Sequence, residues 1–250
     1  MKIYKKVIPN EYVFTIRDID YNKLKEQGIK ALFFDLDNTI IPYDVNVISD
    51  VDKAFLEELN KVFKVLVISN SRKKRVSTAT KPLEGIPYVK FARKPLKFGF
   101  KKGLKLLNVK PSEVCIIGDQ VMTDILGANR LKAKYSILVK PVKQRSDHIL
   151  TRFNRRVERY LLKKAKRKMP EVYEKVFENM KENKYCLGCG AIKQTNDEKT
   201  VGYVKDFSHL YCLECYSLKN YGKTSNNFHP NRYLDIKPNS LVLIFQSIMQ

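Results

Sequence analysis

Tryptophan is absent from this chain of 250 residues, and acidic residues are scarce. Lys and Arg number 48 against 26 Asp and Glu, which gives a formal net charge of +22. Such an imbalance favours anionic partners: nucleic acid, anionic lipid or phosphorylated molecules. The same composition also suits an AT-biased genome, in which case many of the lysines are only solvated surface. Composition alone leaves both interpretations open.

Long apolar runs are missing as well. No segment approaches the length of a transmembrane helix, and no apolar core of signal-peptide length follows the basic start Met1–Lys6. Of the five cysteines, four fall into two Cys-x-x-Cys pairs, which suit a reducing compartment and a metal better than disulfides. We therefore expect a cytoplasmic protein, with a peripheral place at a membrane as the alternative.

Short apolar runs alternate with helical patterns through the first half of the chain. Helix alternating with apolar strand is typical of a parallel α/β sheet. A chain of this length can hold one such domain and a small additional module. The expected helices span 20–28, 49–63, 98–107 and 120–130. The expected strands span 31–34, 64–70, 87–92, 113–119 and 135–139.

Polar side chains gather where these strands end. The carboxyl edge of an open parallel sheet is where ligands bind, so polar residues that follow several strands are expected to meet there. Convergence of this kind is hard to obtain by chance. The residues concerned are Asp35 and Asp37 after the first strand, Ser69 and Asn70 after the second, Lys94 beside the third, and Asp119 after the fourth.

The pair Asp35 and Asp37 indicates acid/base or metal chemistry. Residues two apart on a strand face the same side, and two carboxylates aimed at one point repel each other unless a cation or a proton intervenes. The set fits phosphoryl transfer through an aspartyl phosphate. An ionised nucleophile suits Asp35, and a carboxyl group that protonates the leaving alcohol and then deprotonates water suits Asp37.

The remaining polar residues fit the same reaction. Asp119 and Asp124, together with Asp35 and Asp37, are predicted ligands of Mg²⁺, which would offset the charge of a phosphate that meets carboxylates. Ser69 and Lys94 are predicted catalytic residues, because a hydroxyl and a fixed positive charge can stabilise phosphate oxygens. Thr39 and Asn70 are predicted substrate contacts.

These motifs resemble those of the haloacid dehalogenase (HAD) superfamily. The resemblance lies in Asp35-x-Asp37-x-Thr39, Ser69, Lys94 and Gly118-Asp119-x-x-x-x-Asp124, in that order. The stretches 34–39, 92–95 and 118–130 are more narrowly similar to YqeG-type phosphatases of subfamily IIIA, over roughly residues 1–165. The resemblance implies a Rossmann-like fold and Mg²⁺ dependence. It also implies that Asp35 is the nucleophile and Asp37 the acid/base. Ser69 and Lys94 would then contact the phosphate, and Asp119 and Asp124 would be ligands of the metal ion.

The spacing of the motifs leaves no room for a cap domain. The intervals 39–69 and 70–94 each hold little more than a helix and a strand, whereas a separate domain needs about 50 residues. An uncapped site cannot enclose a small metabolite, so we expect a large anionic substrate. YqeG-type proteins also resemble mitochondrial phosphatidylglycerophosphate phosphatases, which implies a lipid phosphate. Phosphorylated protein or RNA ends remain alternatives.

Residues 147–168 read as a basic amphipathic helix. One interpretation is a helix packed on the sheet with a solvated basic side, and the other is a surface for anionic lipid or RNA. A basic helical linker is expected over 166–184. The residues expected to share the apolar face are Ile149, Leu150, Phe153, Val157, Tyr160 and Leu161.

A second, metal-bound module is expected over 185–250. Cys186, Cys189, Cys212 and Cys215 form a C-x₂-C-x₂₂-C-x₂-C pattern, which predicts a closed, zinc-ribbon-like Zn²⁺ site in a segment too short to build a core. Cys115, inside an apolar strand, is expected to be a buried packing residue.

The Cys pattern with its flanking residues resembles the N-terminal zinc segment of YqeH-type circularly permuted GTPases, which act in small ribosomal subunit assembly. Here no GTPase domain follows, so the segment reads as a truncated front end, with a deliberate two-module protein as the alternative. The alternative function is thus an RNA- or ribosome-associated module. The expected domains are 1–165, 166–184 and 185–250.

Overall fold

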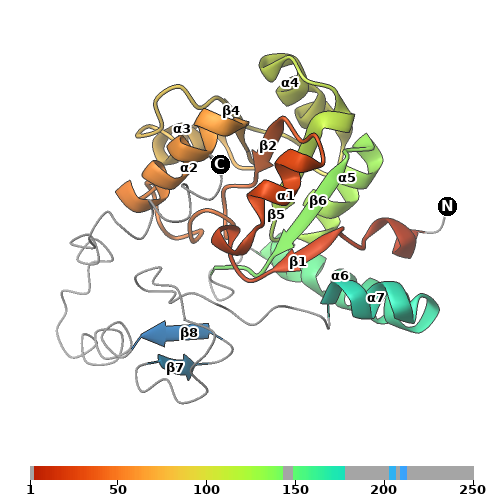
Figure 1. Cartoon of the computed structure of the whole chain (residues 1–250). Coiled ribbons are helices and arrows are strands. Elements are labelled where there is room, and N and C mark those ends of the chain that lie inside the picture. The colour runs from red at the N-terminus through yellow and green to blue at the C-terminus, as the bar shows by residue number, and fades with distance from the viewer. Residues whose placement is uncertain (1–2, 143–148, 178–202, 207–208, 213–250) are drawn as a thin grey trace. The chain divides into compact units, whose positions relative to one another are not determined.

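The computed structural model describes residues 3–142, 149–177, 203–206 and 209–212 (Figure 1). The chain divides into two compact units, Met1–Met180 and Lys181–Gln250. Among the described residues no helix has both the length and the apolar character needed to cross a membrane.

A six-stranded sheet forms the centre of the first unit, with the strand order β1-β6-β5-β2-β3-β4. Every neighbouring pair is parallel, as the alternation of strand and helix predicts. The central strand β2 lies between β5 and β3, so the ends of these three strands share one edge. The strands are β1 (Glu11–Val13), β2 (Ala31–Phe34), β3 (Lys64–Ile68), β4 (Tyr88–Val89), β5 (Val114–Gly118) and β6 (Tyr135–Val139).

Helices connect the strands and begin at the expected caps. The Asp20 side chain accepts a hydrogen bond from the Lys23 amide, and the Ser49 side chain accepts one from the Asp52 amide, which satisfies amides that the first helical turn leaves unpaired. The helices are α1 (Tyr21–Glu26), α2 (Asp50–Val62), α3 (Lys73–Ala79), α4 (Lys97–Leu107) and α5 (Leu126–Leu131), with short turns η1 (Ile3–Lys6), η2 (Ile16–Asp18), η3 (Pro111–Glu113) and η4 (Val121–Ile125).

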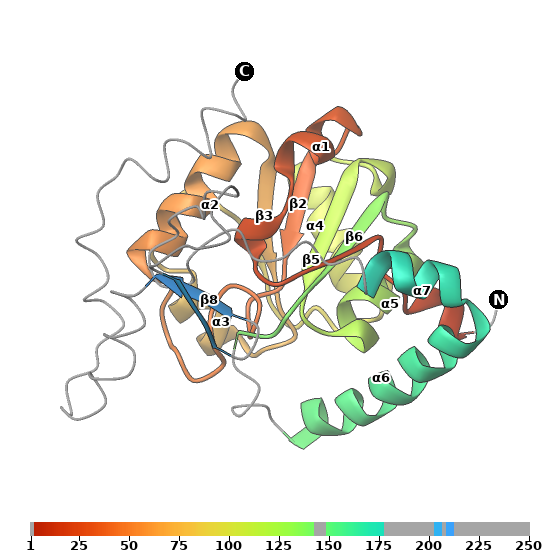
Figure 2. The same ribbon diagram turned by 60° about the horizontal axis from the view of Figure 1, so that its bottom comes forward.

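The sheet is covered on both faces (Figure 2). On one face, Phe33 of β2 and Leu66 of β3 pack with Phe100 of α4 and Leu131 of α5. On the other face lie α1 and α2, which meet through aromatic rings such as that of Tyr21. A strand covered on both faces is apolar throughout, which explains why β2, β3 and β5 were readable from the sequence.

Three local features differ from the expectation. The third strand ends at Val89 rather than at residue 92, because Phe91 and Arg93 adopt positive φ angles of 48° and 55° and turn the chain. The helix expected from residue 120 begins instead with a π-helical turn, η4, before α5. The edge strand β1 was not expected, because three residues are too few for a periodic pattern.

Two further helices, α6 (Ile149–Lys168) and α7 (Pro170–Phe177), pack on the same unit. Leu161 of α6 is buried against Tyr4 and Val7, and the Phe177 ring lies 5.5 Å from that of Tyr12. Tyr160, expected on the apolar face, is 63% exposed, so its assignment was wrong: the packed side continues through Leu161 and Ala165. The side chains of Ile149, Leu150 and Phe153 lie outside the described part of the chain.

The second unit contains a described two-stranded antiparallel sheet of β7 (Tyr203–Asp206) and β8 (His209–Cys212). Cys212 ends β8, whereas Cys186, Cys189 and Cys215 lie outside the described residues. The Zn²⁺ site, the RNA- or ribosome-associated role, and the domain limits at 165, 184 and 250 therefore stay predictions.

Candidate active site

Lys94 connects two buried carboxylates at the carboxyl edge of the sheet. Its Nζ lies 2.6 Å from Asp35 Oδ1 and 2.6 Å from Asp124 Oδ1, and it donates to the Ile68 carbonyl oxygen at 3.3 Å. Asp35 follows β2, and Asp124 comes from η4 after β5. The three side chains are almost fully enclosed, so their interactions act at close range with little screening by water.

A third carboxylate, that of Asp119, completes a cluster. Oxygen atoms of Asp35, Asp119 and Asp124 lie within 4.8 Å of one another. Asp119 Oδ2 accepts a hydrogen bond of 2.6 Å from Arg155 Nη2 of α6, while Asp119 Oδ1 is buried without a hydrogen-bond partner. A buried, unpartnered carboxylate oxygen is costly unless a cation or a proton meets it.

Burial and mutual repulsion shape the pKa values of this cluster. Burial raises the pKa of Asp35 well above its usual range; Lys94 opposes this effect, and repulsion from Asp124 adds to it. Burial likewise raises the pKa of Asp119 to about 7, against the lowering effect of Arg155. Burial alone would lower the pKa of Lys94, but the Asp124 and Asp35 carboxylates raise it instead. When all three carboxyl groups are ionised, the cluster therefore holds more negative charge than Lys94 and Arg155 compensate.

These donors fit a divalent metal ion. Three clustered carboxylates are hard oxygen ligands, and the unpartnered Asp119 Oδ1 supplies a free ligand atom. Asp37, also predicted as a ligand, is not part of this cluster.

The Asp37 carboxylate is held by four donors instead. Ser69 Oγ donates to its Oδ2 at 3.2 Å and Ser71 Oγ at 2.7 Å. Arg75 of α3 donates to its Oδ1 from Nε at 3.1 Å and from Nη2 at 2.9 Å. Two guanidinium bonds to one oxygen and two hydroxyl bonds to the other fix the orientation of this side chain.

Arg75 also anchors the loop that follows β2. It donates to the carbonyl oxygens of Val45 and Pro42, and its guanidinium lies over the Tyr43 ring, 5.7 Å from the centroid. One side chain thus joins α3, Asp37 and residues 42–45.

The other predicted polar residues lie around the same edge. Asn70 accepts a bond of 2.7 Å from the Lys94 amide and donates one of 3.1 Å to the Lys94 carbonyl oxygen, so it anchors the main chain of Lys94. Thr39 is buried, and its Oγ1 lacks a hydrogen-bond partner. Cys115 is fully buried in β5, as expected for a packing residue.

Gly118 makes the close approach of Asp124 possible. A Cβ atom at position 118 would lie 2.3 Å from Asp124 Cγ, which is far inside van der Waals contact. The Asp124 carboxylate also accepts bonds of 3.1 Å from the Gln120 amide and from Thr123 Oγ1, both to Oδ2. The wide turn of η4 directs these groups back toward β5.

Ser71, Arg75, Arg155 and Glu158 belong to the site or its support, and the sequence reasoning missed them. Arg155 and Glu158 were read only as parts of a basic helix. Glu158 is buried, accepts a bond of 3.0 Å from the Met122 amide and has a raised pKa, chiefly through burial. A single acid among many basic residues was the one signal that could have indicated it.

Comparison with known proteins agrees with this geometry. The family described as Mitochondrial PGP phosphatase matches residues 1–143. Probable phosphatase YqeG of Bacillus subtilis is 40% identical over 165 residues, which cover 66% of this chain and 94% of that protein. Phosphatidylglycerophosphate phosphatase 1, chloroplastic/mitochondrial, of Arabidopsis thaliana is 30% identical over 172 residues, covering 65% of this chain and 49% of that protein.

A solved structure is similar only weakly. The cobalt-bound deoxy-D-mannose-octulosonate 8-phosphate phosphatase (YrbI) of Haemophilus influenzae has a TM-score of 0.38 and 13% identity, over 60% of this chain and 98% of that one. Similarity at this level supports no conclusion on function.

The matched residues and the YqeG relative show the class of this protein: the chain belongs to the mitochondrial PGP phosphatase family. It is an enzyme, a phosphatase that hydrolyses phosphomonoesters. The family match ends at residue 143 and so does not bear on residues 185–250.

Proposed function

We propose that the chain is a Mg²⁺-dependent phosphatase that works through a phosphoryl group carried on Asp35. The observation that supports this most directly is the meeting of Asp35, Lys94, Asp119 and Asp124 at one edge of the sheet. Asp35, Asp119 and Asp124 would hold the ion, which would supply positive charge beside the transferring phosphoryl group.

The chain's own residues account for both half-reactions. Asp35 attacks phosphorus, and the bond from phosphorus to the alcohol oxygen breaks. Asp37 takes up a proton from solvent on the oxygen that substrate binding frees, and it gives this proton to the alcohol oxygen as the alcohol leaves. Water then attacks phosphorus and gives a proton to Asp37, and the bond to Asp35 breaks with release of inorganic phosphate. Lys94 holds positive charge beside the equatorial oxygens throughout.

Asp37 must free one of its oxygens to do this. Its Oδ2 is occupied by Ser69 and Ser71, whereas Arg75 holds its Oδ1 and keeps the side chain oriented. A bound phosphate offers the two serine hydroxyls a competing set of oxygens. We therefore assign the release of Asp37 to substrate binding, which places the acid/base at the leaving oxygen only when a phosphoester is present.

The proposed substrate is a lipid phosphate with the phosphatidylglycerophosphate headgroup. The family match and the Arabidopsis relative support this choice. The described fold adds a second argument: one helix, α2, separates β2 from β3, and one helix, α3, separates β3 from β4, so neither interval holds a domain that could enclose a small substrate.

The substrate proposal predicts a preference that can be measured. Phosphate release from phosphatidylglycerophosphate in vesicles should exceed release from mononucleotides, sugar phosphates and phosphopeptides by at least about tenfold in kcat/KM. All four are assayed with Mg²⁺ and with EDTA. Equal or faster hydrolysis of any soluble ester would contradict the lipid assignment but leave the phosphatase chemistry standing.

Replacement of Arg75 by Met is expected to lower kcat about 10²-fold on a soluble aryl phosphate, with a smaller change in KM. The reason is that Asp37 and residues 42–45 lose the side chain that orients both. Arg75→Lys should recover part of the rate, because it retains the charge but not the fork of donors.

The matched control is Arg72→Met, an exposed neighbour just before α3. If Arg75→Met and Arg72→Met have the same kcat on the aryl phosphate, Arg75 does not position the acid/base.

A further inference from the structure

The surface beside Lys94 exposes large apolar side chains. Phe91 is 49% exposed, Leu96 56% and Phe98 65%. They lie in the loop 90–96 and the first turn of α4, on either side of the buried Lys94. We call Phe91, Leu96 and Phe98 the apolar rim.

Two of these residues, Phe91 and Leu96, occupy backbone positions that do not suit their side chains. Phe91 has a φ of 48°, a backbone region that a bulky residue rarely adopts. Leu96 occupies the N-cap of α4 without a side-chain capping bond, although leucine is among the poorest residues for that position. An apolar side chain that helps neither the backbone nor the core indicates a role at the surface.

The rim is rigidly attached to the catalytic loops. The Phe91 amide donates to the Ser71 carbonyl oxygen at 3.2 Å, and the Ala92 amide donates to that of Ser69 at 3.0 Å. The Gly99 amide in turn donates to the Ala92 carbonyl oxygen at 3.1 Å. A partner that binds the rim is therefore held beside Asp37 and Lys94.

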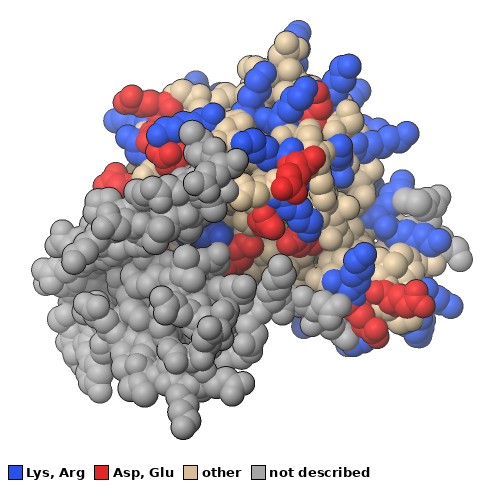
Figure 3. Space-filling model, in the orientation of Figure 1, with Lys and Arg blue, Asp and Glu red and all other residues tan. Residues whose placement is uncertain are grey.

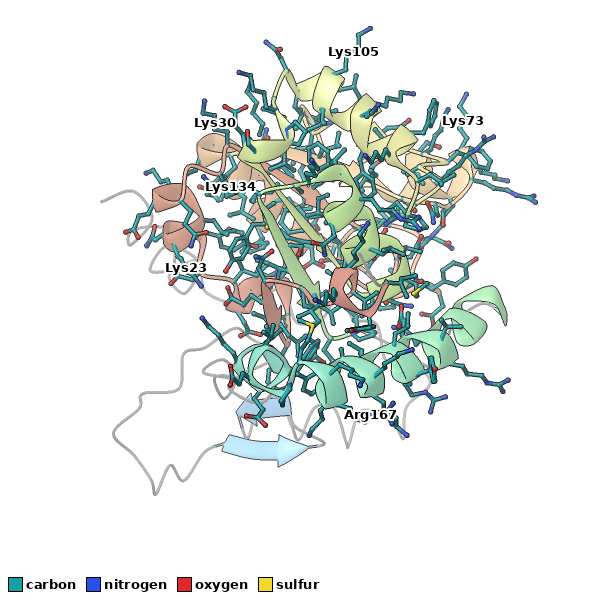
Figure 4. The ribbon with its side chains drawn as sticks, turned by 90° about the vertical axis from the view of Figure 1, so that its right-hand side faces the viewer. Lys23, Lys30, Lys73, Lys105, Lys134 and Arg167 are labelled. Atoms are coloured by element: carbon teal, nitrogen blue, oxygen red, sulfur yellow. The ribbon has the colours of Figure 1, made fainter. Side chains whose placement is uncertain are left out.

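Basic residues predominate in the part of the sequence that holds the rim. Between Ser69 and Ser112, Glu84 is the single acid against thirteen Lys and Arg residues, of which Lys94 and Arg75 are paired with carboxylates of the active site. Figure 3 shows Lys and Arg crowded over α4, and Figure 4 shows Lys73 of α3 extended into solvent.

These basic residues lie close enough to affect one another. The pKa of Lys90 is lowered, first by desolvation and then by repulsion from Lys73 and Lys102. Three elements, α3, the loop before Phe91 and α4, thus contribute to one positive field. Such a field is complementary to a surface of fixed negative charge.

We propose that the apolar rim and its lysines dock the enzyme on an anionic lipid bilayer, with the active site turned toward the headgroups. Lysine chains reach the phosphates of the interface while Phe and Leu enter the acyl boundary. A leucine provides no ring for stacking on a nucleobase, so the mixture favours lipid over RNA. This proposal rests on the proposed lipid substrate and adds the surface that delivers it.

The test compares two parts of the surface with equal changes in charge. Lys97→Gln/Lys101→Gln/Lys102→Gln removes three charges beside the rim, and Lys163→Gln/Lys166→Gln/Arg167→Gln removes three exposed charges from α6. Sedimentation of the full chain with phosphatidylcholine vesicles is measured with and without phosphatidylglycerol. The rim variant should bind the anionic vesicles about 10²-fold more weakly, since each lysine near such a surface contributes about a factor of five.

A second pair tests the apolar side chains. Leu96→Ser/Phe98→Ser should reduce binding to anionic vesicles about tenfold. Leu106→Ser is the matched control, because Leu106 is 51% exposed but lies about 12 Å farther along α4. All variants should hydrolyse a soluble aryl phosphate as the wild type does, and serine at the N-cap should not harm folding.

The outcomes separate this proposal from the proposed substrate. Rim variants that lose vesicle binding while the α6 and Leu106 variants retain it support docking, even if the bound enzyme fails to cleave lipid phosphates. Equal loss in the α6 variant, equal binding of the wild type to neutral and anionic vesicles, or unchanged vesicle binding by the rim variants would overturn docking. Unchanged cleavage of vesicle-borne lipid phosphate by the rim variants would overturn it while leaving the substrate assignment intact.

Discussion

Replacement of Asp35 by Asn is expected to remove phosphatase activity almost completely, by roughly 10⁴- to 10⁶-fold in kcat. An amide cannot supply the carboxylate oxygen that attacks phosphorus, and no other described carboxylate occupies its place: Asp119 is paired with Arg155, and Asp37 is held by Arg75. The loss should therefore be far larger than a change in substrate binding could produce.

The measurement is single-turnover and steady-state hydrolysis of an aryl phosphate with saturating Mg²⁺. Asp50→Asn, an exposed change at the start of α2, is the matched control and should retain full activity. Circular dichroism and thermal unfolding establish that both variants fold. Substantial turnover by a folded Asp35→Asn enzyme would exclude the aspartyl-phosphate mechanism.

Replacement of Lys94 by Met should destabilise the metal-free protein by about 3–5 kcal/mol, because it leaves two buried carboxylates without their cation. Lys94 lies 2.6 Å from both Asp35 and Asp124, and all three side chains are enclosed. For a unit of this size the change corresponds to a fall of about 6–20 °C in Tm. Mg²⁺ should restore part of this loss, since it supplies the missing positive charge.

The same variant should show a definite pH dependence in EDTA. An acid whose pKa is raised on folding binds more protons in the folded state, so stability falls as pH rises from its unfolded value of 3.8 through its folded value. Asp35 is such a group, and the pKa of Asp119 is raised to about 7. Loss of Lys94 enlarges this effect. The free energy of unfolding of Lys94→Met should therefore fall below that of the wild type by more at about pH 8 than at about pH 5.

Lys97→Met is the control for this experiment, because it makes the same chemical change on an exposed residue three positions away. The assigned role of Lys94 would be contradicted if Lys94→Met and Lys97→Met lowered Tm by similar amounts. It would also be contradicted if the stability difference between Lys94→Met and the wild type grew as pH falls.

The sheet and much of the site were predictable because their signals are local in sequence. An apolar run followed at once by a polar side chain marks the end of a buried strand, as for Asp35 and Asp119. Ser71, Arg75 and Arg155 carry no such signal. Their targets lie 34, 38 and 36 residues away, and only the loop after β3 and the packing of α3 and α6 bring them to Asp37 and Asp119.

The exposed rim was unpredictable for a different reason. Apolar periodicity in residues 98–107 correctly indicated a helix, but the pattern does not show that Phe98 and Phe100 differ in burial. Phe100 is fully buried under the sheet, whereas Phe98 faces solvent. The phase of α4 is set by the close packing of Gly99 on Ala92 and of Gly103 on Leu66, which no single-sequence pattern reveals.

Because of the contacts of α6, the first unit can complete its fold only late in synthesis, after α6 has been made. Asp35, Lys94, Asp119 and Asp124 all leave the ribosome before Arg155, and η1 near the N-terminus acquires its cover only when Leu161 follows. A growing chain that has reached only α5 thus carries a carboxylate cluster with one cation, Lys94, and an uncovered apolar strip around Tyr4 and Val7. Because domains fold as units when their last contacts become available, the catalytic edge and the N-terminal segment are completed together, by the same helix.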